Sequence, residues 1–176
     1  MSSSCDPALA PAGDVVTALL MIDSRLKCLH ERKAEIDPEQ RKMIEEFTAS
    51  LDREGANAVL DGACTLIFMY MTWLRSAYER HDKDVIENVV PHLVATMRMM
   101  PASISPEVIP TMAGLVIAAG NDLSPNLWRK QYGDWTDAEM TPLEATATLL
   151  AEHINGLTGD PDFATRMISD ALAAAG

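Results

Sequence analysis

The sequence predicts an all-α protein: a compact bundle of about six to eight helices around a central apolar helix near residues 57–81. Six of the ten prolines directly follow Asp, Ser or Thr, which is typical of helix starts, and glycines stand where helical patterns end. Apolar residues recur at helical spacing through most of the chain. No segment alternates apolar and polar residues between hairpin turns, as a strand would.

Three helices are predicted in the first part of the chain. Residues 1–13 are rich in Ser, Pro and Ala and predict a disordered tail, followed by a single helical domain over 14–176. Asp14 is a capping residue for a first helix over 14–33. A capping-box pattern with proline predicts a second helix over 37–55, ending at a glycine. The third is the central helix, 57–81.

The central helix is apolar on all sides in its middle, as expected of a helix surrounded by others. Gly62 inside it costs about 1 kcal/mol relative to alanine, so we expect another helix to cross closely there. Its longest apolar stretch, Ala63–Leu74, has twelve residues and is interrupted by Thr65 and Thr72. A bilayer needs about 20, and the run therefore predicts a buried core helix, not a membrane span.

A fourth helix is predicted to start at Asp82 or Asp84 and to run to Met100. Pro91 falls inside this pattern, and a proline inside a helix removes one backbone hydrogen bond and crowds the preceding turn. We therefore expect a kink or a break near residues 89–90.

Four further helices are predicted after residue 100. They span 105 to 120, 124 to about 132, 142 to 155, and 160 into the C-terminus. Thr136 with Glu139, and Thr141 with Glu144, form two overlapping capping boxes, which predict a single turn ahead of the third of these helices. Gly156 is expected to end that helix.

The net charge of the chain limits which classes of partner are expected. The net charge is −12 and the isoelectric point is about 4.6. Nucleic acid is therefore not an expected partner, because binding it requires clustered Lys and Arg. Residues 101–176 carry three cations against ten acids, so a basic partner could be steered to this half.

The three cysteines indicate a reducing compartment. Cys5, Cys28 and Cys64 are odd in number and irregular in spacing, which does not resemble a disulfide framework. The first thirteen residues lack a basic region followed by an apolar run, so no secretory signal is predicted. We expect a cytoplasmic protein without a membrane partner, and a homodimer stays possible.

No pattern for common catalysis or cofactor binding is present. The sequence has no Glu-x-x-His or His-Glu-x-x-His pair for metals, no glycine-rich nucleotide loop and no Gly-x-Ser-x-Gly elbow. The histidines lie on separate segments, and Cys64 lies in the most apolar helix. We therefore predict no metal and no cofactor, and lean against an enzyme.

Two sets of residues indicate binding. The first is a soft apolar set that could line a ligand pocket between helices, since Met adapts to irregular apolar surfaces. It comprises Met69, Met71, Trp73, Met97, Met100 and Met112. The second is an aromatic segment between helices, of the residue types that dominate protein interfaces. It comprises Trp128, Arg129, Tyr132 and Trp135. Each set can equally be a packing feature.

These observations predict a non-catalytic helical binding module that recognises a protein partner or a small apolar ligand. Two alternatives stay open. One is an enzyme on the same scaffold, with a site assembled from the scattered residues Glu79, His81, His92 and Glu144. The other is a ligand-sensing regulator that has no DNA-binding unit of its own.

Overall fold

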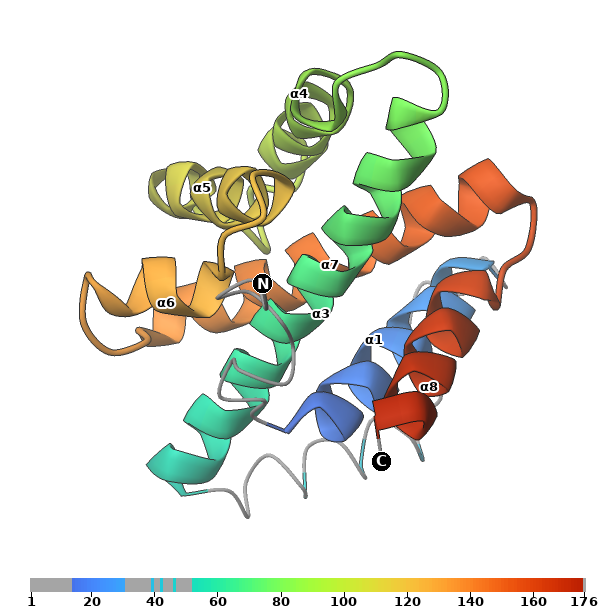
Figure 1. Ribbon diagram of the computed structural model, residues 1–176. Coiled ribbons are helices and arrows are strands. Elements are labelled where there is room, and N and C mark those ends of the chain that lie inside the picture. The colour runs from blue at the N-terminus through green and yellow to red at the C-terminus, as the bar shows by residue number, and fades with distance from the viewer. Residues whose placement is uncertain (1–13, 31–38, 40–41, 43–45, 47–51, 176) are drawn as a thin grey trace.

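The computed structural model describes residues 14–30, 39, 42, 46 and 52–175 (Figure 1). These residues form helices and no strand, which confirms the all-α prediction. The helices are α1 (Val15–His30), α3 (Arg53–Glu79), α4 (Val85–Arg98), the 3-10 helix η1 (Pro106–Val108), α5 (Ile109–Gly120), α6 (Pro125–Lys130), α7 (Asp137–Thr158) and α8 (Phe163–Ala175). The predicted tail and most of the predicted helix 37–55 lie outside the described residues, and the single domain stays a prediction.

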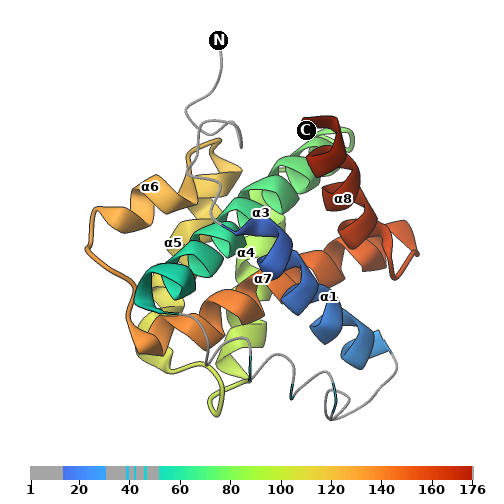
Figure 2. The same ribbon diagram turned by 90° about the horizontal axis from the view of Figure 1, so that it is seen from below.

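Helix α3 is the centre of the fold, as its composition predicts. It contacts each of the other α-helices of the described residues. Figures 1 and 2 show α5 and α6 on one side of it and α1 and α8 on the other. Leu66, Ile67, Tyr70, Met71 and Leu74 of α3 are all fully buried. This position explains why the helix is apolar on every side.

Gly62 marks the closest approach between α1 and α3. A Cβ at this position would lie 2.4 Å from the carbonyl oxygen of Asp14, at the start of α1. The backbone nitrogen of Asp14 also donates to the carbonyl of Ala58, at 2.8 Å. The predicted close crossing at Gly62 is therefore present, and only glycine leaves room for it.

The start of α3 differs from the prediction. Gly55 was expected to end one helix, with the next beginning near Asn57. Instead Asp52 caps α3, and its carboxylate accepts a hydrogen bond from the Gly55 nitrogen at 2.7 Å. The Asp side chain satisfies a backbone donor that the first turn leaves unpaired, so the helix begins four residues before Asn57, at Arg53.

Pro91 does not break α4, so of the kink or break expected near residues 89–90 the break does not occur. The helix runs continuously from Val85 to Arg98. Both Pro91 and Glu87, whose carbonyl loses its helical donor, are exposed. Water can therefore satisfy that carbonyl, which removes most of the reason for a break. Asp84, and not Asp82, is the cap: its carboxylate accepts from the nitrogens of Ile86 and Glu87.

Helix α7 also differs from its prediction. It is one helix from Asp137 to Thr158, capped by the Thr136–Glu139 box, so the second box at Thr141 does not start a helix. Gly156 lies inside it, and the helix ends at Gly159, which has φ 69°. A glycine ends a helix when the chain needs a positive φ, and only Gly159 has one here.

By length and composition alone, one helix of the described residues, Glu54–Glu79, could cross a membrane. However, 61% of its most apolar window is buried by the other helices, as in the core of a soluble protein.

Burial of this core raises the pKa of the Cys64 thiol well above its ordinary value, so this cysteine stays protonated and unreactive.

Candidate functional site

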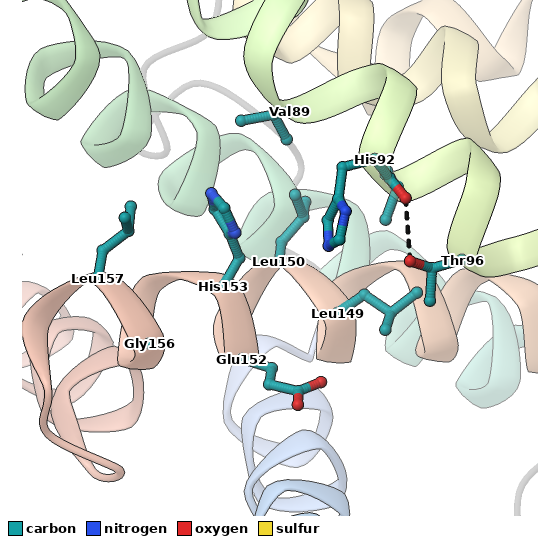
Figure 3. A pocket seen from close by; sticks show the side chains of 10 residues that line it. Val89, His92, Thr96, Leu149, Leu150, Glu152, His153, Gly156 and Leu157 are labelled. Atoms are coloured by element: carbon teal, nitrogen blue, oxygen red, sulfur yellow. Dashed lines mark hydrogen bonds between the residues drawn. The ribbon is translucent and has the colours of Figure 1, made fainter.

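A groove between α4 and α7 combines apolar walls with two imidazoles (Figure 3). Its volume is about 390 Å³, within the range of about 300–1,000 Å³ that small-molecule sites occupy. Its walls are aliphatic and come from both helices: Val89 and Leu93 of α4, with Leu149, Leu150 and Leu157 of α7. Leu157 is 51% exposed, so one apolar wall faces water when the groove is unfilled.

The polar part of the groove is built by His92 of α4 and His153 of α7. Their ring centroids lie 6.1 Å apart, with the rings tilted by 40°. In Figure 3 both rings point into the space between the helices, whereas Glu152 points to the opposite side of α7. The Thr96 hydroxyl also lines the groove and donates to the carbonyl of His92 at 2.9 Å.

Tyr78 of α3 fixes the orientation of His153. Its hydroxyl lies 2.8 Å from Nε2 of His153, and the two rings are nearly parallel, at 12°. Nδ1 of the same ring has no hydrogen-bond partner among the described residues. A ring held at one nitrogen by a tyrosine presents its other nitrogen in a fixed direction, which is how an oriented imidazole binds a ligand.

Burial keeps the Tyr78 phenol and the His153 imidazole uncharged. Desolvation lowers the pKa of His153, and the neighbouring His92 lowers it further. Desolvation also raises the pKa of the Tyr78 phenol. At neutral pH the proton therefore stays on the tyrosine oxygen and His153 is a neutral imidazole. The groove thus offers an uncharged hydrogen-bonding group beside an apolar surface.

The chain matches no family model, no curated protein and no solved structure. What this groove binds is therefore inferred from its own residues.

The predicted methionine set does not meet in one pocket. Met71, Met97 and Met112 are fully buried in the core. Met69 and Trp73 line a second groove, of about 460 Å³, between α3 and α8. Met100 packs half-buried against the core and lines neither groove. At Met71, Met97 and Met112 the flexible methionine side chain therefore fills the protein interior.

Within the predicted aromatic segment, Arg129 is held inside the protein. Its guanidinium donates to both carboxylate oxygens of Glu139, at 2.7 and 2.5 Å, and to the carbonyls of Gly133 and Asp134. It also lies 4.8 Å from the centroid of the Trp135 ring. Arg129 is 5% exposed, so its charge is used to fix the connection between α6 and α7.

The other two aromatics of that segment reach the surface. Tyr132 is 69% exposed. Trp128 is half-buried against α5, and its ring fills the space that a side chain at Gly114 would need. The two rings pack edge to face, with centroids 5.4 Å apart.

The four scattered catalytic candidates lie in different places. Glu79 is exposed and pairs with Arg75, and His81 is exposed in the following turn. Glu144 pairs with Arg25 of α1 at 2.8 Å and does not line the α4–α7 groove. Only His92 lies in the α4–α7 groove. In the described ranges no group of three or more His, Cys, Asp or Glu could hold a metal ion.

Sequence reasoning missed the pairing of His92 with His153, although both residues are visible in the sequence. They lie 61 positions apart on different helices, and nothing in their local patterns marks them as partners. The one available signal is that each stands next to a core aliphatic residue, Leu93 or Ile154, which places it at the edge of a buried face.

Proposed function

We propose that this protein is a non-catalytic binding module that holds a small, uncharged, amphipathic molecule in the α4–α7 groove. The observation that carries the proposal is the combination of aliphatic walls with one half-buried, neutral imidazole whose direction is fixed by Tyr78. Small-molecule sites are mostly apolar and contain a few convergent polar groups of this kind.

The chemistry of the groove defines the ligand. At roughly 30 Å³ for each water-sized group, 390 Å³ accommodates about a dozen non-hydrogen atoms. The apolar body would cover Leu93, Leu149 and Leu157, and a hydroxyl or carbonyl would meet Nδ1 of His153. An ionic group is disfavoured, because the one charged residue among the described residues that line the groove, Glu152, points its carboxylate to the opposite side of α7 (Figure 3), so these residues offer no counter-charge beside the imidazoles.

The test is an NMR titration with two probes of this class, 1-octanol and benzyl alcohol. Saturable shifts are expected at the imidazole nitrogens of His92 and His153 and at the methyl groups of Leu149 and Leu157. Gly156→Leu should abolish them, because Gly156 lines the groove and a Cβ there meets nothing within 4 Å. Leucine is also a better helix former than glycine, so this variant blocks the groove without loss of stability.

The control variant is His81→Leu, because His81 is exposed and lies outside the groove. It should leave the titration unchanged. Shifts that persist in Gly156→Leu, or shifts confined to other surfaces, would contradict the proposal. Chemical conversion of a bound probe, seen as a new mass, would instead favour the enzyme alternative.

We further propose a cytoplasmic location for this module. Cys28 and Cys64 are both free thiols, which suits a reducing compartment. The measurement is the fraction of the protein that remains in the soluble cytosolic extract after cell fractionation.

A further inference from the structure

The corner between α5 and α6 carries an unusual share of exposed apolar surface. Eight large hydrophobic side chains are exposed among the described residues, and four of them lie within residues 117–132. They are Ile117, Leu123, Leu127 and Tyr132, with exposed fractions of 37, 52, 49 and 69%. Scattered exposed leucines are ordinary, whereas a concentration of this kind marks an interaction surface.

Helix α6, which carries part of this surface, is held in place by hydrogen bonds and packing contacts with α3, α5 and α7. Ser124 caps α6, and the side-chain amide of Asn126 donates to the carbonyl of Asp61 in α3. Arg129 is locked to Glu139, as described above. Trp128 rests on Gly114 of α5 and supports Tyr132 from the side. Held aromatic rings lose little conformational entropy on binding, which is why Trp and Tyr dominate interface hot spots.

A groove of about 450 Å³ lies beside these rings. Val108 of η1 and Pro110 and Thr111 of α5 form one wall, and Trp128 of α6 and Tyr132, just after α6, form another. Arg129, Thr136 and Glu139 complete the lining. Its size suits one or two apolar side chains inserted by a partner. The aromatic pair and the groove therefore form one docking surface, which we call the α5–α6 surface.

The charge around the α5–α6 surface is acidic. The two cations of α6 are both engaged by carboxylates of this chain: Arg129 by Glu139, and Lys130 by Asp61 at 3.5 Å. Among the described residues, four exposed acids lie within two positions of its lining or apolar residues, and the one exposed cation so placed, Lys130, is the one paired with Asp61. The acids are Glu107, Asp122, Asp134 and Asp137.

We propose that the α5–α6 surface binds a basic protein segment, in which an apolar anchor side chain is flanked by Lys and Arg. The anchor enters the groove beside Trp128 and Tyr132, and the flanking cations face the acidic border. A second copy of this chain fits poorly, because a symmetric contact would bring two acidic borders together in a protein of net charge −12.

The experiment uses two labelled probe peptides and fluorescence anisotropy with the full chain. One peptide is an amphipathic helix with Leu and Trp on one face and Lys and Arg on the other. In the second, every Lys and Arg is replaced by Glu. The basic peptide should bind, and its affinity should fall at least tenfold between about 0.1 M and 1 M salt, as the Debye length shrinks from about 10 to 3 Å. The acidic peptide should not bind.

Two variants locate the contact. Leu127→Ser and Tyr132→Ser should each weaken the basic peptide at least tenfold, because both side chains are exposed and contribute little to the core. Leu20→Ser is the matched control, since Leu20 is 63% exposed on α1, and it should bind like the parent protein. Circular dichroism verifies that all three are folded.

Three results would overturn the proposal. Equal loss in Leu20→Ser and Leu127→Ser would show general attraction to an acidic protein. Absence of binding by the basic peptide at low salt would remove the partner chemistry. Sedimentation of the free protein as a dimer that Leu127→Ser dissociates would assign the surface to a second copy. None of these depends on the α4–α7 groove, so Gly156→Leu should leave peptide binding unchanged.

Discussion

Replacing Glu139 with alanine should severely destabilise the protein, because it would leave a buried guanidinium without its counter-charge. The side chains of Arg129 and Glu139 are 6% and 7% exposed. Glu139 receives two hydrogen bonds from Arg129 and two more from the backbone nitrogen and hydroxyl of Thr136. The variant removes all four, so that Arg129 keeps its hydrogen bonds to the carbonyls of Gly133 and Asp134 and its contact with the Trp135 ring.

The expected loss in unfolding free energy is about 3–5 kcal/mol, the range observed when one partner of a buried ion pair is removed. Domains of this size have a total stability of about 5–15 kcal/mol, so the variant would be marginally folded. Glu139→Gln keeps the shape and most of the hydrogen bonds, and it should lose roughly half as much. Urea unfolding followed by circular dichroism at several temperatures measures both.

The control is Glu144→Ala, which breaks the Arg25–Glu144 ion pair at the surface. Arg25 is 51% exposed, so the expected loss is about 0–1 kcal/mol. If Glu139→Ala also lost less than about 1 kcal/mol, the buried pair would not stabilise the α6–α7 connection, and Arg129 would be available for binding after all.

The same pair should give an acid-dependent loss of stability. The hydrogen bond from Arg129 lowers the pKa of Glu139 below its ordinary value. The stabilisation is therefore fully present above the unfolded-state pKa of about 4.3 and disappears as the pH falls through the lower folded-state value. Glu139→Gln should remove this part of the pH dependence.

Three further predictions follow from the fold. Gly62→Ala should lower the unfolding free energy by about 1–3 kcal/mol in urea titrations, because the new Cβ would lie 2.4 Å from the Asp14 carbonyl oxygen at the start of α1. The control is Gly156→Ala, which has open space and should leave the unfolding free energy unchanged or raise it by up to about 1 kcal/mol. Equal effects of the two substitutions would refute the close crossing. Asp52→Ala removes the N-cap of α3 and should lower the unfolding free energy by about 1 kcal/mol, which is seen as a lower thermal midpoint. An unchanged midpoint would show that this cap does not stabilise the protein. Since burial lowers the pKa of His153, stability and probe binding should both decline as the pH falls below about 6.5, and His153→Gln should flatten both profiles; an unchanged decline in that variant would place the titrating group elsewhere.

The sequence determined the class of fold and its centre through local chemistry. Caps such as Asp84 and the Thr136–Glu139 box act over three or four residues, so they can be recognised along the chain. The uniformly apolar middle of α3 required burial on every side, and Gly62 inside it required a close neighbour. Both features follow from composition alone, and the structure supplies α1 as that neighbour.

Helix boundaries were less predictable because several valid signals compete. Gly55 and Gly156 are both typical stops, yet each lies inside a helix, since neither adopts a positive φ. Pro91 is tolerated because its lost hydrogen bond faces water. Which signal prevails depends on the solvent exposure of the backbone and on the packing of neighbouring helices, and neither is visible in local sequence.

The sequence by itself also determined which residue types could bind, and it placed Trp128, Arg129, Tyr132 and Trp135 in one segment. Only the tertiary structure decided which of them face inward. Arg129 turns toward Glu139, ten residues away, while Tyr132 is left at the surface. The pairing of His92 with His153 was likewise decided by how α4 packs on α7, because contacts between distant helices depend on the packing of whole faces and not on any local pattern.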